Sequence, residues 1–214
     1  MSQQYEFDLF TIGAGSGGVA GSRRAAAYGA RVGICEDSRV GGTCVMRGCV
    51  PKKLLVYGAH VAEELEEARG FGWSIPPAKF SWPSLIAAKN LELDRLNAIY
   101  RGMLTSAGVE LVVGRGRLLD RNTVQVGERR VTARRILVAT GSRPVLPPTP
   151  GIEHAITSNE ALDLPELPKR IVIVGGGYIA VEFAGIFNAL GCEVTLVFRG
   201  DTVLKGFDRD IRSH

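Results

Sequence analysis

Two cysteines, Cys44 and Cys49, are separated by four residues in the stretch GGTCVMRGCVPKK. A structural disulfide, half of a metal site or a redox-active dithiol would each use such a pair. Zinc takes four ligands, usually as two close pairs, and no second pair exists, so we predict no metal site. A structural disulfide would close a very short loop and stabilise the fold little. The spacing therefore favours a redox-active dithiol. The other cysteines and the histidines are isolated in the sequence: Cys35, Cys192, His60, His154 and His214.

The residues around Cys49 favour its thiolate form. Pro51 is a preferred first residue of a helix, so we expect Cys49 to lie at a helix start. The positive end of a helix dipole stabilises a thiolate, and Lys52 and Lys53 add positive charge. Gly48 eases the turn between the two cysteines.

Two copies of a strand, glycine turn, helix and strand pattern begin about 160 residues apart and must position this chemistry. The first copy consists of strand Phe7–Ile12, turn Gly13–Gly18, helix Ser16–Tyr28 and strand Arg31–Cys35. The second copy consists of strand Ile171–Val174, turn Gly175–Ala180, a helix to Leu190 and strand Glu193–Phe198.

The first glycine turn matches the GxGxxG pattern of dinucleotide-binding sites. Its glycines allow a tight turn, a close approach to a pyrophosphate, and packing of helix on strand. Glu36 lies 23 residues after Gly13, where an acid accepts hydrogen bonds from ribose hydroxyls and repels a 2′-phosphate. We therefore predict a site for FAD or NAD rather than NADP. The contributing turn residues are Gly13, Gly15, Ser16, Gly17 and Gly18.

The second glycine turn reads GxGxxA, from Gly175 through Gly177 to Ala180. Arg199 lies 24 residues after Gly175, in nearly the register of the acid in the first copy. An arginine there favours a 2′-phosphate, and Lys205 adds a second positive charge. This copy is predicted to bind NADPH.

The remaining segments complete an α/β organisation. We predict helices at Pro51–Arg69 and Trp82–Ala107, and strands at Val109–Val113, Arg117–Leu119, Thr123–Val126, Arg129–Val131 and Ile136–Ala139. The predicted domains are an FAD-binding Rossmann-like domain with inserted helices and a β-meander (1–150), a linker (151–168), and the start of a second, truncated NAD(P)-binding Rossmann-like domain (169–214). Sixteen residues follow Phe198, too few to complete that domain, so we interpret the chain as a fragment.

The composition excludes several classes of protein. The chain of 214 residues is 45% hydrophobic and 22% charged, which is typical of globular domains. It has no apolar stretch near the ~20 residues of a membrane helix and no signal peptide, so we expect a cytoplasmic protein without a membrane partner. The net charge is +4, but the basic residues are scattered and lack interleaved aromatics, so no nucleic-acid binding is predicted.

Four motifs together resemble the FAD- and NADPH-dependent disulfide reductases and, within that family, the glutathione reductases. They are GGTCVMRGCVPKKLLVYGA, LNAIY, ILVATGSRP and GGGYIAVEFAG, and the similarity runs through essentially all 214 residues. The resemblance implies an oxidoreductase in which hydride passes from NADPH to FAD, and electrons then pass to a Cys44–Cys49 disulfide and to glutathione disulfide. It also implies a homodimer of the full-length protein.

The same resemblance implies a role for individual residues. Cys49 would be the thiol next to the flavin, and Cys44 the interchange thiol that attacks glutathione disulfide. Lys52 would lie near flavin N5 and pair with Glu182, and Tyr178 would cover the nicotinamide pocket. The implied FAD site adds Gly42, Thr43, Cys44, Lys52, Thr140 and Gly141. The implied NADPH site is Gly175, Gly177, Tyr178, Ile179, Glu182, Arg199 and Lys205. The implied glutathione contacts are Ser16, Arg23 and Tyr100.

Some alternatives stay open at this point. Arg47 resembles the plant and bacterial glutathione reductases, and Arg199 argues against lipoamide dehydrogenases, which usually have an acid at the second ribose position. Mercuric and trypanothione reductases differ in parts that lie partly beyond this chain. A truncated FAD-binding module without turnover is the other alternative. The family's acid–base His–Glu pair and dimer interface are C-terminal, so no histidine of this chain is given that role.

Overall fold

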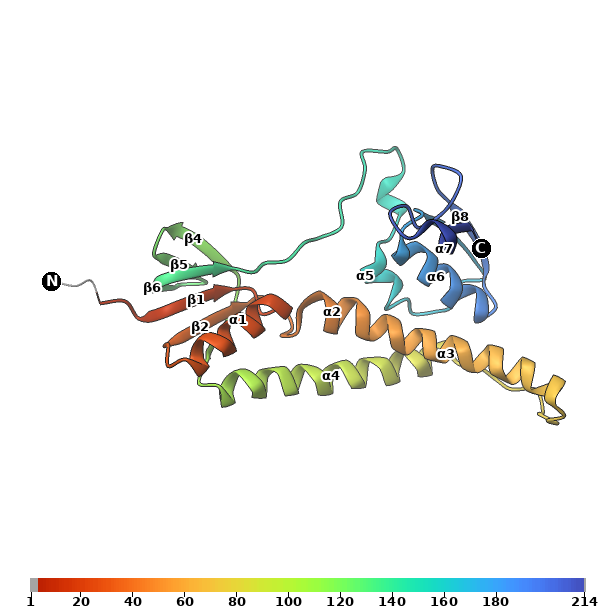
Figure 1. Ribbon diagram of the computed structural model, residues 1–214, viewed down its shortest axis with the longest axis horizontal. Helices are drawn as coiled ribbons and strands as arrows, with labels where there is room; N and C mark the ends of the chain where they lie inside the picture. Colours follow the sequence, from red (N-terminus) through yellow and green to blue (C-terminus); the bar gives the residue numbers. More distant parts are fainter. Residues whose placement is uncertain (1–3, 214) are drawn as a thin grey trace. The chain divides into compact units, whose positions relative to one another are not determined.

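The computed structural model describes residues 4–213 and divides into two compact units, each considered by itself below (Figure 1). The first unit contains the chain up to Val50 and Asn90–Ala155. The second contains Pro51–Lys89 and the chain from Ile156 onward. The functional boundaries at 150 and 168 stay a prediction.

The first unit is built on a six-stranded sheet of order β3-β2-β1-β6-β5-β4. The four strands β3, β2, β1 and β6 are parallel, and β6, β5 and β4 continue as an antiparallel meander. This confirms the mixed α/β class with a parallel core. The strands are β1 (Phe7–Ile12), β2 (Val32–Glu36), β3 (Glu110–Val113), β4 (Gly116–Asp120), β5 (Thr123–Val126) and β6 (Arg129–Val138).

Strand β6 corrects one prediction. The two strands expected at Arg129–Val131 and Ile136–Ala139 are a single strand of ten residues. Its first half pairs antiparallel with β5 and its second half parallel with β1. Arg134 and Arg135, between the two expected strands, are exposed, and the strand continues through them. One strand thus joins the meander to the dinucleotide-binding part of the sheet.

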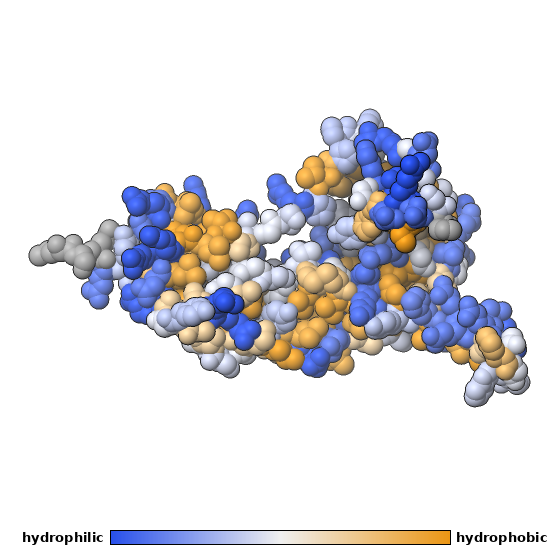
Figure 2. All heavy atoms as spheres, in the orientation of Figure 1, coloured by the Kyte–Doolittle hydropathy of each residue, from blue (hydrophilic) through white to orange (hydrophobic). Residues whose placement is uncertain are grey.

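Apolar clusters cover both faces of this sheet. Helix α1 (Ser16–Ala27) contributes Val19, which clusters with Ile34 of β2 and Leu104. A second cluster contains residues of β1, β2 and the meander: Phe7, Phe10, Ile12, Cys35, Val124, Val126, Val131 and Ala133. On the face seen in Figure 2, apolar residues also reach the surface over the meander, where charged residues surround them.

The second unit contains the second glycine turn. Strands β7 (Arg170–Val174) and β8 (Glu193–Val197) are parallel, and helix α6 (Tyr178–Ala189) connects them. An apolar cluster joins helix α6 to the 51–89 segment and to the chain before β7: Leu55, Ala59, Trp82, Ala161, Leu162, Phe183, Ile186, Phe187, Leu190 and Cys192. The further helical elements of the chain are α2 (Gly42–Arg47), α3 (Cys49–Glu67), η1 (Ala68–Phe71), α4 (Trp82–Ser106), η2 (Ile152–His154), α5 (Ser158–Ala161) and α7 (Arg209–Ser213).

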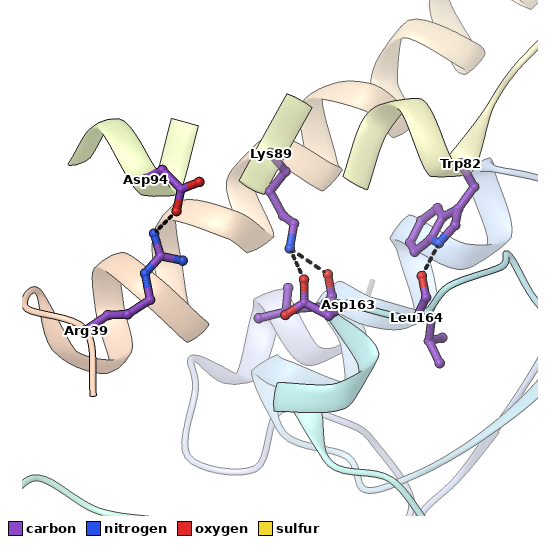
Figure 3. Close-up of polar contacts among 7 residues, drawn as sticks. Arg39, Trp82, Lys89, Asp94, Asp163 and Leu164 are labelled. Carbon is purple, nitrogen blue, oxygen red and sulfur yellow. Dashed lines mark hydrogen bonds and ion pairs between the residues drawn. The ribbon is translucent and has the colours of Figure 1, made fainter. Parts of the chain in front are cut away.

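A buried lysine stabilises the region of the apolar cluster in the second unit (Figure 3). Lys89 is 2% exposed, and its ammonium donates to the Leu162 carbonyl at 2.9 Å and to the Asp163 carboxylate at 2.5 Å. The Trp82 indole donates to the Leu164 carbonyl at 2.7 Å. A buried charge needs such partners. These bonds explain why the 51–89 segment belongs with the later part of the chain.

Most element boundaries shift by one or two residues from their expected places. Helix α3 begins at Cys49 rather than at Pro51. Pro51 is tolerated in the first turn because the N–H groups there have no intrahelical partner. Helix α2, six residues long, was not predicted at all. Among the described residues, no helix is both long enough and apolar enough to span a membrane.

Candidate active site

The first glycine turn leaves no room for a side chain at Gly13 or Gly18. Gly13 has φ +101°, and its N–H donates to the Cys35 carbonyl at 2.9 Å. A Cβ on Gly13 would lie 2.4 Å from the Ala139 oxygen, and one on Gly18 would lie 1.9 Å from the Gly13 oxygen. The turn therefore closes directly on the end of β6, next to Thr140. The residue after it, Gly141, has φ +68°.

Glu36, the last residue of β2, has its carboxylate at this turn. Its Oε2 accepts from the Ala14 N–H at 2.7 Å, and its Oε1 accepts from the Ser38 N–H at 3.1 Å. A carboxylate has about four acceptor positions, so it can still accept from ribose hydroxyls. The sequence indicated the ribose role but not this second role of ordering the turn.

The cysteine-bearing segment is packed on the same turn. Gly42 has φ +66°, and a Cβ on it would lie 2.4 Å from the Gly15 Cα. The Gly41 N–H donates to the Ala14 carbonyl at 2.9 Å. Helix α2, which carries Cys44, therefore starts in backbone contact with the dinucleotide turn. The paired glycines before Thr43 were the sequence signal for this contact.

The two thiols lie within hydrogen-bonding reach of each other. Cys44 is in α2 and is half-buried, whereas Cys49 is the first residue of α3 and is exposed. The interaction with the Cys49 side chain, followed by burial, raises the pKa of Cys44. Gly48 permits the approach, because a Cβ there would lie 2.9 Å from the Thr43 oxygen. The pair lies near the distance of a disulfide.

Lys52 and Glu182 form an ion pair in the second unit. The Lys52 ammonium donates to Glu182 Oε1 at 2.7 Å, and the two side chains are only 28% and 33% exposed. Lys52 belongs to α3 and Glu182 to α6, and the apolar cluster around Leu55 and Phe183 packs these helices together. The structure therefore fixes the ammonium by both charge and packing.

The second glycine turn repeats the first with more space. The Gly175 N–H donates to the Val197 carbonyl at 2.8 Å, as Gly13 does to Cys35. A Cβ on Gly175 would lie 3.6 Å from the Ala180 Cβ, which is an ordinary contact. The third position of this turn is Ala180, where the first turn has Gly18. Gly177 comes just before α6, and Tyr178 and Ile179 at the helix start are exposed.

Both predicted 2′-phosphate residues lie close to this turn in the chain path. Arg199 follows β8, and Lys205 follows Leu204, whose N–H donates to the Gly176 carbonyl at 2.6 Å. Both side chains are exposed, and neither has a hydrogen-bond or ion-pair partner within residues 4–213. Their charges are therefore available to an anion.

The structure brings the predicted glutathione residues together only in part. Ser16 and Arg23 are exposed and seven residues apart on α1, which places them on one helix face. Arg23 lines a groove of about 490 Å³ with Ile99 and Met103 of α4. Tyr100 is half-buried against neighbouring apolar clusters. In residues 4–213, no hydrogen bond joins these three side chains.

No metal centre accompanies the dithiol in the described part of the chain, where no three ligand-type side chains cluster. His60 is exposed, and His154 is exposed with its Nε2 3.7 Å from Glu153. The remaining histidine, His214, lies outside the described residues.

The first turn fits a bound dinucleotide, because its glycine backbone is bare where a pyrophosphate would approach and Glu36 lies at the ribose position. The second turn has the same design with basic residues in place of the acid. Together, the fold and the site define the class of α/β flavoproteins that have two dinucleotide-binding turns and a dithiol. More specifically, the chain belongs to the pyridine nucleotide-disulphide oxidoreductase family, whose sequence profile matches residues 7–214. This family uses FAD and NAD(P)H.

Relatives with known names agree with that assignment. The chain is 54% identical over 209 residues to a glutathione reductase of Nostoc sp., which covers 98% of this chain and 46% of the relative. It is 54% identical over 218 residues to a chloroplastic/mitochondrial glutathione reductase of Pisum sativum, covering 97% of this chain and 40% of the relative. It is 45% identical over 231 residues to a trypanothione reductase of Trypanosoma congolense, covering 96% and 47%. The chain thus spans less than half the length of these relatives.

Proposed function

We propose that the protein is an NADPH-dependent glutathione-disulfide reductase, of which this chain carries the FAD-binding domain, the dithiol and the start of the NADPH-binding domain. The observation that carries the proposal is the contact between the Cys44 and Cys49 thiols, held on the first dinucleotide turn by Gly42. The identity to proteins named glutathione reductase supports glutathione disulfide as the substrate. A cytoplasmic location and a homodimer of the full-length protein are part of the proposal and rest on the sequence analysis.

FAD would be held by the first turn, by Gly42 and Thr43, and by the Thr140–Gly141 segment. When bound, it transfers electron pairs between NADPH and a disulfide. The N–H groups at the start of α1 would bind the pyrophosphate, and Glu36 would accept hydrogen bonds from the ribose. The Lys52 ammonium, oriented by Glu182, would place a fixed positive charge near the flavin ring.

The dithiol would reduce glutathione disulfide in two exchanges. The Cys44 thiolate attacks one sulfur of glutathione disulfide, forms a mixed disulfide and releases one glutathione thiolate, which takes up a proton. The Cys49 thiolate then attacks the Cys44 sulfur, which forms the Cys44–Cys49 disulfide and releases the second glutathione. Two electrons leave the dithiol and two enter the substrate.

The first exchange requires a base. Because the hydrogen bond to Cys49 and burial raise the pKa of Cys44, its thiolate is scarce at neutral pH. The resemblance to the family implies an acid–base His–Glu pair in the C-terminal part of the partner subunit. The raised pKa of Cys44 gives a physical reason for such a pair.

NADPH would bind at the second turn, with Arg199 and Lys205 on its 2′-phosphate and Tyr178 over the nicotinamide pocket. Two unpaired cationic side chains in the chain segment that follows β8 suit a dianionic phosphate better than a ribose hydroxyl. This arrangement favours NADPH over NADH.

The test is a turnover assay on the full-length, FAD-loaded protein. We expect NADPH oxidation that depends on glutathione disulfide and falls at least ~1,000-fold in Cys44→Ser, because the attacking sulfur is lost. Cys192→Ala, at a buried cysteine before β8, is the matched control and should keep turnover. Dependence on trypanothione disulfide instead would assign a different substrate, and reduction of the flavin without any disulfide turnover would identify a binding module.

A further inference from the structure

The loop after β8, residues 198–205, carries both basic residues and is called here the specificity loop. It is attached to the second glycine turn at both ends. At its start, the Val197 carbonyl accepts from the Gly175 N–H at 2.8 Å. At its end, the Leu204 N–H donates to the Gly176 carbonyl at 2.6 Å. The path of the specificity loop therefore determines where its cations lie relative to the turn.

The specificity loop is held in a conformation that its own sequence does not favour. Leu204 has φ +58°, the one positive φ at a non-glycine residue among the described residues. A leucine in this left-handed region is under steric strain and persists only when its surroundings hold it. Gly200 and Gly206, at φ +102° and +98°, make the neighbouring backbone easy to deform. A brace from outside the loop is therefore needed.

Arg212 holds the specificity loop from outside with two hydrogen bonds. Its Nε donates to the Val203 carbonyl at 3.2 Å, and its Nη2 donates to the Thr202 hydroxyl at 2.5 Å. The fork of the guanidinium thus spans two consecutive residues of the specificity loop, next to Leu204. Arg212 is half-buried in helix α7, which the Asp208 carboxylate caps by accepting from the Asp210 N–H at 2.9 Å.

We propose that Arg212 is a positioning residue for cofactor specificity: it holds the specificity loop in the conformation in which Arg199 and Lys205 bind the 2′-phosphate of NADPH. Arg212 itself donates its hydrogen bonds to the specificity loop and acts through Arg199 and Lys205. This inference rests on the proposed function, because it presumes that the second turn binds NADPH. It adds a residue that the ribose position in the sequence pattern does not indicate.

The experiment measures binding of adenosine 2′,5′-bisphosphate and of 5′-AMP, which differ only in the 2′-phosphate, to the full-length, FAD-loaded protein by calorimetry. In Arg212→Ala, we expect the Kd of the bisphosphate to rise about tenfold, the worth of a charge-assisted hydrogen bond. The Kd of 5′-AMP should change less than about twofold, because it lacks the group that the loop recognises. In turnover, the KM for NADPH should rise while kcat is kept.

Two further variants separate bracing from total charge. Arg209→Ala removes the same charge from the same helix, but the Arg209 side chain is exposed and has no partner within residues 4–213, so binding should not change. Arg212→Lys keeps the charge but cannot bridge both acceptors, so it should weaken bisphosphate binding nearly as much as alanine does. Thr202→Val removes a single acceptor without altering α7, and should weaken binding in the same direction by a smaller factor.

Several results would overturn the inference. The role of Arg212 would be wrong if Arg209→Ala weakened binding equally or if Arg212→Lys bound the bisphosphate like the wild type. It would also be wrong if both Arg212→Ala and Thr202→Val kept the preference for the bisphosphate. Each of these results would leave the assignment of NADPH intact. A wild-type protein that binds the bisphosphate no better than 5′-AMP would overturn the NADPH assignment itself, and the role of Arg212 with it.

Discussion

At the scale of single residues, the structure distinguishes two cysteines that the sequence presents as a pair. The interaction with the Cys49 side chain and burial raise the pKa of Cys44. Cys49 begins a helix and is exposed. The sequence anticipated the helix start, because Pro51 signals it. It could not give the interaction between the two thiols, since that depends on how closely Gly48 lets the two residues approach.

The pH dependence of Cys44 alkylation tests this difference. In the reduced protein, iodoacetamide should modify Cys44 only as the pH rises above the usual range of a thiol, because the thiolate is the reactive form. Cys49→Ala removes the first cause of the raised pKa, so the pKa of Cys44 should fall and its alkylation near pH 8 should become faster. Mass spectrometry of the Cys44 peptide measures the rate. An unchanged or slower rate in the variant would contradict the hydrogen bond.

Other residue-level features show where sequence reasoning ends. The family motifs indicated the Lys52–Glu182 pair, and the structure has that contact at 2.7 Å. The bond from Ala14 to Glu36 and the two bonds of Arg212 had no sequence signal. Each joins a side chain to a backbone or hydroxyl group of another segment, so each depends on tertiary placement rather than on a local pattern.

At the scale of elements, glycine spacing predicted both turns, and the helices that follow them were expected to within two residues. Periodicity could not predict α2, because six residues are too few to show a helical repeat. It also divided β6 in two, because the sequence does not show that one strand pairs with β5 in its first half and with β1 in its second.

The two glycine turns should respond differently to an added methyl group. Gly18→Ala would place a Cβ 1.9 Å from the Gly13 oxygen, so α1 must move away from β1. We expect destabilisation of about 2–3 kcal/mol and loss of bound FAD. Gly102→Ala is the control in helix α4, where a Cβ meets nothing within 4 Å, and it should be neutral or stabilise the protein by up to ~1 kcal/mol.

Urea unfolding and the FAD content of the purified protein measure both effects. The second turn is the internal comparison, since it has the natural alanine Ala180 at the position of Gly18. If Gly18→Ala retained FAD and wild-type stability, the close packing of the first turn would be disproved.

At the scale of the whole molecule, the chain forms two units whose membership does not follow sequence order. The 51–89 segment belongs with residues from 156 onward, which Lys89, Trp82 and the apolar cluster around Leu55 explain. A linear sequence with a proline-rich linker predicts a division near residue 150 instead. The linear pattern could not show that the partners of the buried Lys89 lie far away in the sequence.

Ligand-dependent hydrogen exchange tests the assignment of one dinucleotide to each unit. FAD should protect amides in residues 13–18, 42–47 and 139–141 of the first unit. NADP+ should protect residues 175–180 and 199–205 of the second, and each effect should approach ~2.7 kcal/mol at 100 times the Kd. Mass spectrometry of peptides from the full-length protein resolves these segments. Protection of the first turn by NADP+ alone would contradict the assignment.

The backbone contact between Gly15 and Gly42 has a consequence for protein engineering. Because Gly42 cannot carry a side chain against the Gly15 backbone, the placement of the cysteine helix depends on the dinucleotide turn. A designer who transplants GGTCVMRGC into another scaffold must bring the glycine turn with it, and a loop graft that keeps the cysteines but replaces the turn would lose their placement. The portable unit is therefore residues 7–53 rather than the cysteine motif alone.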